Sequence, residues 1–292
     1  MAQWGIKPAV PMSEEQFRLW QTLVESRTGI LLQPTRKLFL ETCVTTRMRE
    51  LGMEDYDNYY ERLMAGSPGS SEWVALTDKL AVQETSFFRH PSSYHLVESV
   101  LRQLLLNPAK KNVSIWSVGC STGEEPYSLA ILMENVIAGT GRKDIFYGIT
   151  ATDISYPALA KARAGIYPER KLSTVAELSR TRYFTAVPGG REWQVNEGLR
   201  RRVAFGQLNL MEVHKAPFTG LDVIFCQNVL IYFRRFKKRD IVNELADRLT
   251  PGGILVLGPG EVVDWSHPGL ERIEAPDTLA FRSKPAELSA RY

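Results

Sequence analysis

The sequence predicts an α/β domain built on a doubly wound, mostly parallel sheet and preceded by an all-α N-terminal domain. From about residue 112 onward, short apolar runs alternate with helical stretches, which is typical of parallel βαβ units. Runs such as DVIFC are continuously apolar, as expected of strands buried on both faces. The chain before this point shows only helical periodicity, so we assign residues 1–91 to a helical domain and linker.

Four helices are expected in this N-terminal domain. The first begins after Ser13, a favoured N-cap followed by Glu14 and Glu15, and ends at Gly29. The other three are expected over TRKLFLETCVTTRMRELG, DYDNYYERLMAG and SEWVALTDKLAV, with SPGS (67–70) as a loop. The segment QETSFFRHP follows, closed by Pro91, and leads into a connecting helix over 93–106.

The α/β domain is expected over residues 92–292. Its strands are predicted in VSIWSVG, IFYGITATD, LDVIFCQNV and PGGILVLGPG, with a closing pair around ERIEA and TLAFRS. Helices are predicted at about 124–138, 156–164 and 236–249. Between about 165 and 206 the alternation breaks into a polar segment with a VPGG turn. This segment predicts a small inserted β-subdomain.

Composition excludes several classes of protein. A net charge of +3 does not by itself argue for nucleic-acid or membrane binding, and no apolar run has the length of a bilayer span. The N-terminus lacks the pattern of a signal peptide. Cys43, Cys120 and Cys226 lie far apart and the histidines share no ligand spacing, so neither disulfides nor a metal is expected. We therefore expect a cytoplasmic protein without membrane insertion.

The turn SVGCSTGEEP follows the first predicted strand, where ligands bind in doubly wound sheets. Gly119 and Gly123 allow a ligand to approach the backbone closely. Glu124 and Glu125 would repel a phosphate but attract a cation, although acids also suit a helix N-terminus. Asp153 ends the second strand, where a carboxylate commonly binds ribose hydroxyls. Together these acids favour S-adenosylmethionine, an adenosine ligand bearing positive charge.

Six motifs together resemble the chemotaxis receptor methyltransferase family, CheR. They are WSVGCSTGEEPYSLA, ETSFFRHP, TATDIS, GIY, NLME and DVIFCQNVLIYF, in the family's order and covering roughly residues 75–262. The resemblance implies a Rossmann-like class I methyltransferase domain that binds S-adenosylmethionine and releases S-adenosylhomocysteine. It also implies methylation of glutamate side chains on the cytoplasmic helices of chemoreceptors by a protein that we expect to be monomeric.

Carried over by position, the family's cofactor-binding residues are Gln83, Thr85, Arg89, Gly119, Glu124, Glu125, Asp153, Asn209, Leu210, Gln227 and Asn228. The linker residues would reach the cofactor from between the domains. Either glutamate, with the strand-end aspartate, would hold its amino-acid and ribose ends. The pair 209–210 would flank the adenine, and the pair 227–228 would close the methionine side.

Arg89 and Tyr232 are the expected catalytic residues, orienting the glutamate without protonating it. Two positions depart from the family's commonest pattern: Gln83 where Asn is frequent, and Gln227 where Arg is frequent. Loss of that arginine's charge leaves open a second hypothesis, a cofactor-binding regulatory or adaptor homologue. A third, methylation of nucleic acid, is disfavoured because CQNVLIYF stands where such enzymes carry a D/N-P-P-Y/F loop.

Overall fold

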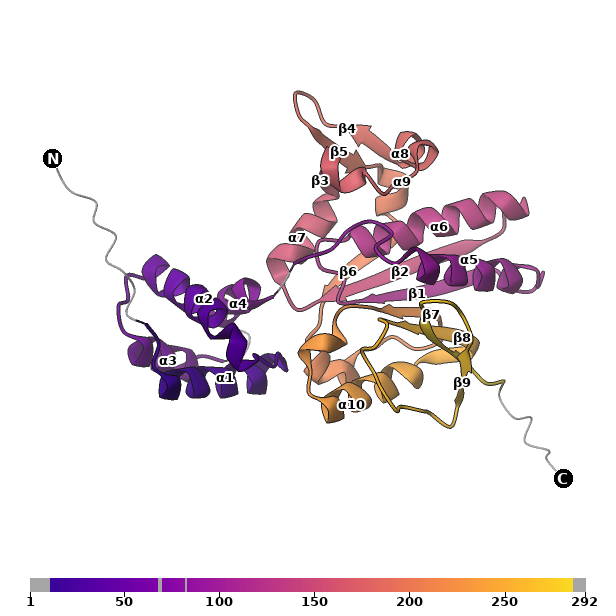
Figure 1. The fold of residues 1–292 in the computed structure, drawn as a ribbon. Helices are drawn as coiled ribbons and strands as arrows, with labels where there is room; N and C mark the ends of the chain where they lie inside the picture. Colours follow the sequence, from indigo (N-terminus) through magenta and orange to yellow (C-terminus); the bar gives the residue numbers. More distant parts are fainter. Residues whose placement is uncertain (1–10, 68–69, 82, 286–292) are drawn as a thin grey trace. The chain divides into compact units, whose positions relative to one another are not determined.

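The computed structural model describes residues 11–67, 70–81 and 83–285 (Figure 1). It divides into two compact units. The first comprises residues up to 82 together with Tyr232–Arg234, and the second holds the rest of the chain. The expectations for the extreme N-terminus, for the middle of the SPGS loop and for a helix end at 82 lie outside the described residues.

The first unit is all-helical, as predicted. Its α-helices are α1 (Glu14–Thr28), α2 (Lys37–Glu50), α3 (Tyr56–Ala65) and α4 (Ser71–Leu80). Ser13 accepts a hydrogen bond from the Gln16 N–H in a capping box, and Gly29 ends α1 in the left-handed region at φ 76°. Trp20, Tyr59 and Trp73 are fully buried in its core. The predicted start and end of α1 are therefore confirmed.

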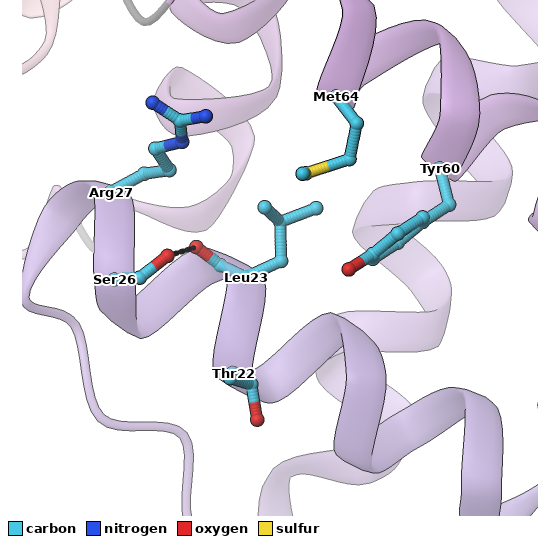
Figure 2. Close-up of a pocket in the computed structure, with 6 residues that line it drawn as sticks. All are labelled: Thr22, Leu23, Ser26, Arg27, Tyr60 and Met64. Carbon is cyan, nitrogen blue, oxygen red and sulfur yellow. Dashed lines mark hydrogen bonds between the residues drawn. The ribbon is translucent and has the colours of Figure 1, made fainter.

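A hollow of about 300 Å³ opens between α1 and α3 of this unit (Figure 2). Its lining residues are Thr22, Leu23, Ser26, Arg27, Tyr60 and Met64. None of these residues is among those that the sequence suggests for catalysis or for binding the cofactor.

The second unit contains a seven-stranded sheet in the order β6-β2-β1-β7-β8-β10-β9. Its strands are β1 (Asn112–Val118), β2 (Phe146–Asp153), β6 (Val203–Gln207), β7 (Leu221–Cys226), β8 (Leu249–Leu257), β9 (Leu270–Ile273) and β10 (Leu279–Ser283). Pairing is parallel from β6 to β8, and β10 is antiparallel to both of its neighbours. The chain order reverses between β1 and β7, which creates the switch point where such sheets bind ligands.

The longer helices of this unit are α5 (Pro91–Leu105), α6 (Glu124–Thr140), α7 (Tyr156–Ala164) and α10 (Arg235–Ala246) (Figure 1). The predicted helix at 156–164 is confirmed, and the doubly wound α/β class is confirmed with it. Pro91 begins α5 two residues earlier than expected. The first helical turn tolerates proline because the N–H there has no partner within the helix.

The inserted subdomain has a three-stranded antiparallel sheet in the order β3-β5-β4. Its elements are β3 (Ile166–Pro168), the 3₁₀ turn η2 (Glu169–Leu172), α8 (Glu177–Tyr183), β4 (Phe184–Ala186), β5 (Glu192–Val195) and α9 (Glu197–Arg200). The expected limit near 206 differs from the structure, because Val203–Gln207 pairs with β2 as the edge strand of the main sheet. This strand is short and contains Gly206, so its pattern is weak in the sequence.

Candidate functional site

The turn after β1 is shaped by close contact with the loop after β7. Gly119 has φ 73°, and its N–H donates to the Thr152 carbonyl over 2.8 Å. A Cβ built on Gly119 would lie 2.0 Å from Cγ2 of Val229, a separation that no real Cβ adopts. Glycine is therefore required here, both for the left-handed backbone and for the approach of the two loops at the switch point.

Asp153, at the end of β2, braces the same turn. Its Oδ2 accepts the Ser121 N–H over 2.8 Å, and its Oδ1 accepts the Ser155 N–H over 2.9 Å. The Ser121 backbone is left-handed at φ 49°. The Oγ of Ser121 is buried and has no hydrogen-bond partner among the described residues. The two carboxylate oxygens of Asp153 therefore hold the turn after β1 and the start of the loop after β2 together.

Glu124 and Glu125 are adjacent at the start of α6 but have different surroundings. Glu124 is completely buried, and its Oε2 accepts a 2.6 Å hydrogen bond from Thr122 Oγ1. Lys171 Nζ lies 3.0 Å from its Oε1 in an ion pair. Glu125 is only partly buried, and its Oε1 accepts from Ser117 Oγ over 2.7 Å.

Glu125 is poised to change its protonation state. Burial raises the pKa of its carboxyl to about 8; the Ser117 hydrogen bond lowers it, the charge of Glu261 raises it and the charge of Arg89 lowers it. Glu261, which the sequence analysis missed, is 4% exposed and accepts the N–H groups of Gly258 (2.8 Å) and Ile231 (3.3 Å). A cation arriving at Glu125 would favour the ionised carboxylate.

The linker segment 83–90 lies against this turn within the same unit. Gln83 Nε2 donates to Ser155 Oγ over 3.3 Å, and the Thr85 carbonyl accepts from Lys171 Nζ. Arg89 is exposed, and its Nη1 donates to the Glu84 carbonyl over 2.7 Å. The structure thus brings the predicted linker residues to the same edge of the sheet as Gly119 and Asp153.

The remaining predicted cofactor residues follow β6 and β7. Asn209 caps the 3₁₀ segment η3 (Leu210–Lys215) by accepting the Met211 N–H over 3.0 Å, and Leu210 is buried. Gln227 is 4% exposed, and its amide donates to Ser93 Oγ and to the Leu257 carbonyl. Asn228 is left-handed at φ 60°, with its Oδ1 3.0 Å from His90 Nε2.

Tyr232 belongs to the helical unit. Its carbonyl accepts the Leu31 N–H over 2.7 Å, and its ring packs against the core of that unit. Arg234, two residues later, forms a paired hydrogen bond with Glu25 of α1. In the sequence, Tyr232 comes shortly after the expected cofactor residues Gln227 and Asn228. No local pattern indicates that Tyr232 itself groups with the helical unit.

The site fits an adenosine ligand with a positive charge. One buried polar atom at this turn, Ser121 Oγ, has no hydrogen-bond partner among the described residues. Carboxyls stand where a phosphate site would carry cations. This fold and site are those of a Rossmann-like methyltransferase that uses S-adenosylmethionine.

Comparison with known proteins identifies the family. The model "CheR methyltransferase, SAM binding domain" matches residues 83–278, and "CheR methyltransferase, all-alpha domain" matches residues 15–81. The chain belongs to the CheR methyltransferase family. It is 34% identical to a chemotaxis protein methyltransferase of Klebsiella aerogenes, over 86% of this chain and 84% of that protein. It is 35% identical to a probable chemotaxis protein methyltransferase of Rhizobium etli, over 82% and 90%.

A relative from Pseudomonas aeruginosa carries a different name. The probable biofilm formation methyltransferase WspC is 32% identical over 90% of this chain, which spans 61% of that protein.

Proposed function

We propose that this methyltransferase transfers the methyl group of S-adenosylmethionine to glutamate side chains of bacterial chemoreceptors, forming glutamyl methyl esters. The observation that carries the proposal is the position of Arg89. This exposed residue follows Phe88, whose N–H donates to Ser128 Oγ of α6 over 3.0 Å, so the linker is held against the helix that begins with the two glutamates. Arg89 would supply a cation for an acceptor carboxylate beside the carboxyls that suit the cofactor. The names of the relatives support chemotaxis as the setting.

The cofactor is proposed to lie along the ends of β1, β2, β6 and β7. When bound, it supplies an activated methyl group on a sulfonium. Glu125 would balance its positive end, and Asp153 would accept from its ribose hydroxyls. The cofactor would contact Gln83, Thr85 and Gly119 near the turn after β1. Its adenine would lie between Asn209 and Leu210. Its methionine portion would lie next to Gln227 and Asn228.

Methyl transfer to a carboxylate needs no general base, because a glutamate is already ionised near neutral pH. What the chain must supply is alignment of the acceptor oxygen and exclusion of water from it. Arg89 would grip the acceptor carboxylate through two parallel hydrogen bonds. Tyr232 is proposed to offer a hydroxyl donor that orients the same group. We place this reaction in the cytoplasm and expect the enzyme to act as a monomer.

The test is to incubate the protein with methyl-labelled S-adenosylmethionine and receptor cytoplasmic fragments. Base-labile label on the receptor supports the proposal. Arg89→Ala should fold and lose most of this transfer, by about 100-fold if the guanidinium orients the acceptor, whereas near-normal turnover would remove Arg89 from the active site. Label on nucleic acid would instead indicate a different class of substrate.

A second candidate function is a regulatory homologue that binds the cofactor without transferring its methyl group. The observation that favours it is Gln227, whose neutral amide stands where the family commonly has arginine. Cofactor binding without any labelled receptor, tested on several receptor fragments, would support this alternative.

A further inference from the structure

We infer that Lys171 of the inserted subdomain is a positioning residue for the cofactor site. It neutralises Glu124 and holds the linker segment 83–90, so that Glu125 is the carboxyl left to meet the cationic end of the cofactor. This inference rests on the proposed placement of S-adenosylmethionine beside α6, but not on the identity of the methyl acceptor.

Lys171 joins two segments that carry predicted cofactor residues. It lies in η2, with its side chain 31% exposed. Its ammonium is 3.0 Å from Glu124 Oε1 and also donates to the Thr85 carbonyl. One side chain therefore connects the inserted subdomain to the first turn of α6 and to the linker.

Neighbouring residues of the subdomain contact the same two segments. The Tyr167 hydroxyl donates to the Thr122 carbonyl over 2.7 Å, and Thr174 Oγ1 donates to the Phe87 carbonyl over 2.8 Å. The ring of Phe87, which is fully buried, packs edge-on at 5.0 Å from Tyr167. Lys171 thus lies between two fixed points, which restricts where its ammonium can reach.

The charges then assign different roles to the two glutamates. A completely buried carboxylate without a partner is costly, and Lys171 provides that partner for Glu124. Within the described part of the chain, no ammonium or guanidinium forms an ion pair with Glu125. Other charged groups change the pKa of the Glu125 carboxyl without forming an ion pair with it. The charged or titratable groups that interact with it are Glu261, Arg89, Asp153, Tyr94, Cys120 and Cys226.

Removing the ammonium should weaken cofactor binding and leave the transfer step itself unchanged. Glu124 would lose its counter-charge, and the linker would lose the bond at Thr85. Lys171 contacts no reacting atom in this arrangement. The expected kinetic signature is a higher KM for S-adenosylmethionine at nearly constant kcat.

The test compares Lys171→Met with Lys171→Arg in the full chain. Titration calorimetry with S-adenosylhomocysteine should show about tenfold weaker binding for Lys171→Met and a loss of less than about threefold for Lys171→Arg. Amide hydrogen exchange of the cofactor-free protein should be faster over 84–90 in the methionine variant alone. Lys161→Met, which removes an exposed lysine of α7 from the same unit, is the control for net charge.

A double variant separates the charge effect from general damage. Glu124→Gln combined with Lys171→Met should bind more tightly than Lys171→Met alone, because the uncompensated carboxylate is gone. Unchanged affinity and unchanged exchange in Lys171→Met would overturn the inference. Equal losses in the arginine and methionine variants would do the same. Since binding of S-adenosylhomocysteine needs no acceptor, failure to methylate receptors leaves this test intact.

Discussion

The side-chain amide of Gln227, at the end of β7, donates to the Oγ of Ser93 in α5 over 2.8 Å. Its second N–H donates to the Leu257 carbonyl of β8 over 3.1 Å. Both amide hydrogens are therefore used to join a helix and two strands within the fold. Gln227 is therefore a neutral side chain that helps to hold this part of the fold together.

Replacement of Gln227 by alanine should destabilise the protein. Two buried hydrogen bonds are lost and a cavity is created, so we expect the free energy of unfolding to fall by about 2–4 kcal/mol. Urea denaturation measures the change. The matched control is Gln207→Ala, because Gln207 is exposed although it also bonds a carbonyl; its cost should stay below about 1 kcal/mol. Equal costs at the two glutamines would contradict the bracing role.

Gly119→Ala should abolish most cofactor binding. The new Cβ would collide with Val229, and alanine is strained at φ 73°, so the turn and the loop after β7 must separate. We expect at least about a tenfold loss of affinity for S-adenosylhomocysteine, measured by calorimetry. The double variant Gly119→Ala/Val229→Ala should recover part of this loss, because it removes the colliding methyl group. A single variant that binds normally would show that the two loops move apart freely.

Cofactor affinity should depend on the protonation of Glu125. With a pKa of about 8, this carboxyl is neutral at pH 6.5 and ionised at pH 9, so its attraction for a cation grows as pH rises. Below this pKa, the affinity for the cofactor should rise by at most about tenfold per pH unit. The ligand's own α-amino group titrates in the same range, and Glu125→Gln controls for it because the ligand is identical. The predicted quantity is the difference between the two pH profiles.

The Glu125 carboxyl should also make the free energy of unfolding depend on pH. Its contribution to stability should fall as pH rises, whereas its contribution to cofactor affinity should grow. Its pKa is about 8 in the folded protein against 4.5 for a free side chain, so the folded state binds more protons between these values. Its contribution to stability is present below pH 4.5 and is lost as pH rises through 8. Glu125→Gln should therefore flatten the decline in the free energy of unfolding over this window. Parallel profiles for the two proteins would indicate that Glu125 titrates normally.

Arg47 should be a structural residue of the helical unit. Its guanidinium pairs with both oxygens of Glu72 (2.9 and 2.8 Å) and with Glu50 (2.7 Å). Arg47→Ala should lower stability by about 1–3 kcal/mol because it leaves Glu72 partly buried without its cation. Thermal denaturation of the full chain is the measurement.

The control for Arg47 is Lys37→Ala in the same helix. Lys37 pairs with Glu14, whose side chain is 74% exposed, and such pairs contribute about 0–1 kcal/mol. If both variants cost the same, the Arg47–Glu72 pair would be no more than an ordinary surface ion pair.

The elements of the fold and their order were predictable because their signals are local. Ser13 and Gly29 mark the two ends of the fifteen-residue helix α1, and α7 matches its predicted bounds. The edge strand β6 was missed as part of the main sheet, because its pairing with β2 depends on residues some fifty positions earlier. Local patterns carry no information about such a partner.

By itself, the sequence determined the two-part organisation, the glycine turn after β1, the carboxyl at the end of β2 and the family. Each of these depends on residue types at short spacings, which act through backbone geometry and burial. Only the tertiary structure separated Glu124 from Glu125, which are neighbours in the sequence but point about 100° apart on a helix. It also gave Gln227 its partners, brought Lys171 and Glu261 to the site and grouped Tyr232 with the helical unit. Most of these relationships join residues far apart in the sequence, and packing decides them because a hydrogen bond or a strong charge interaction needs groups that the fold brings close together.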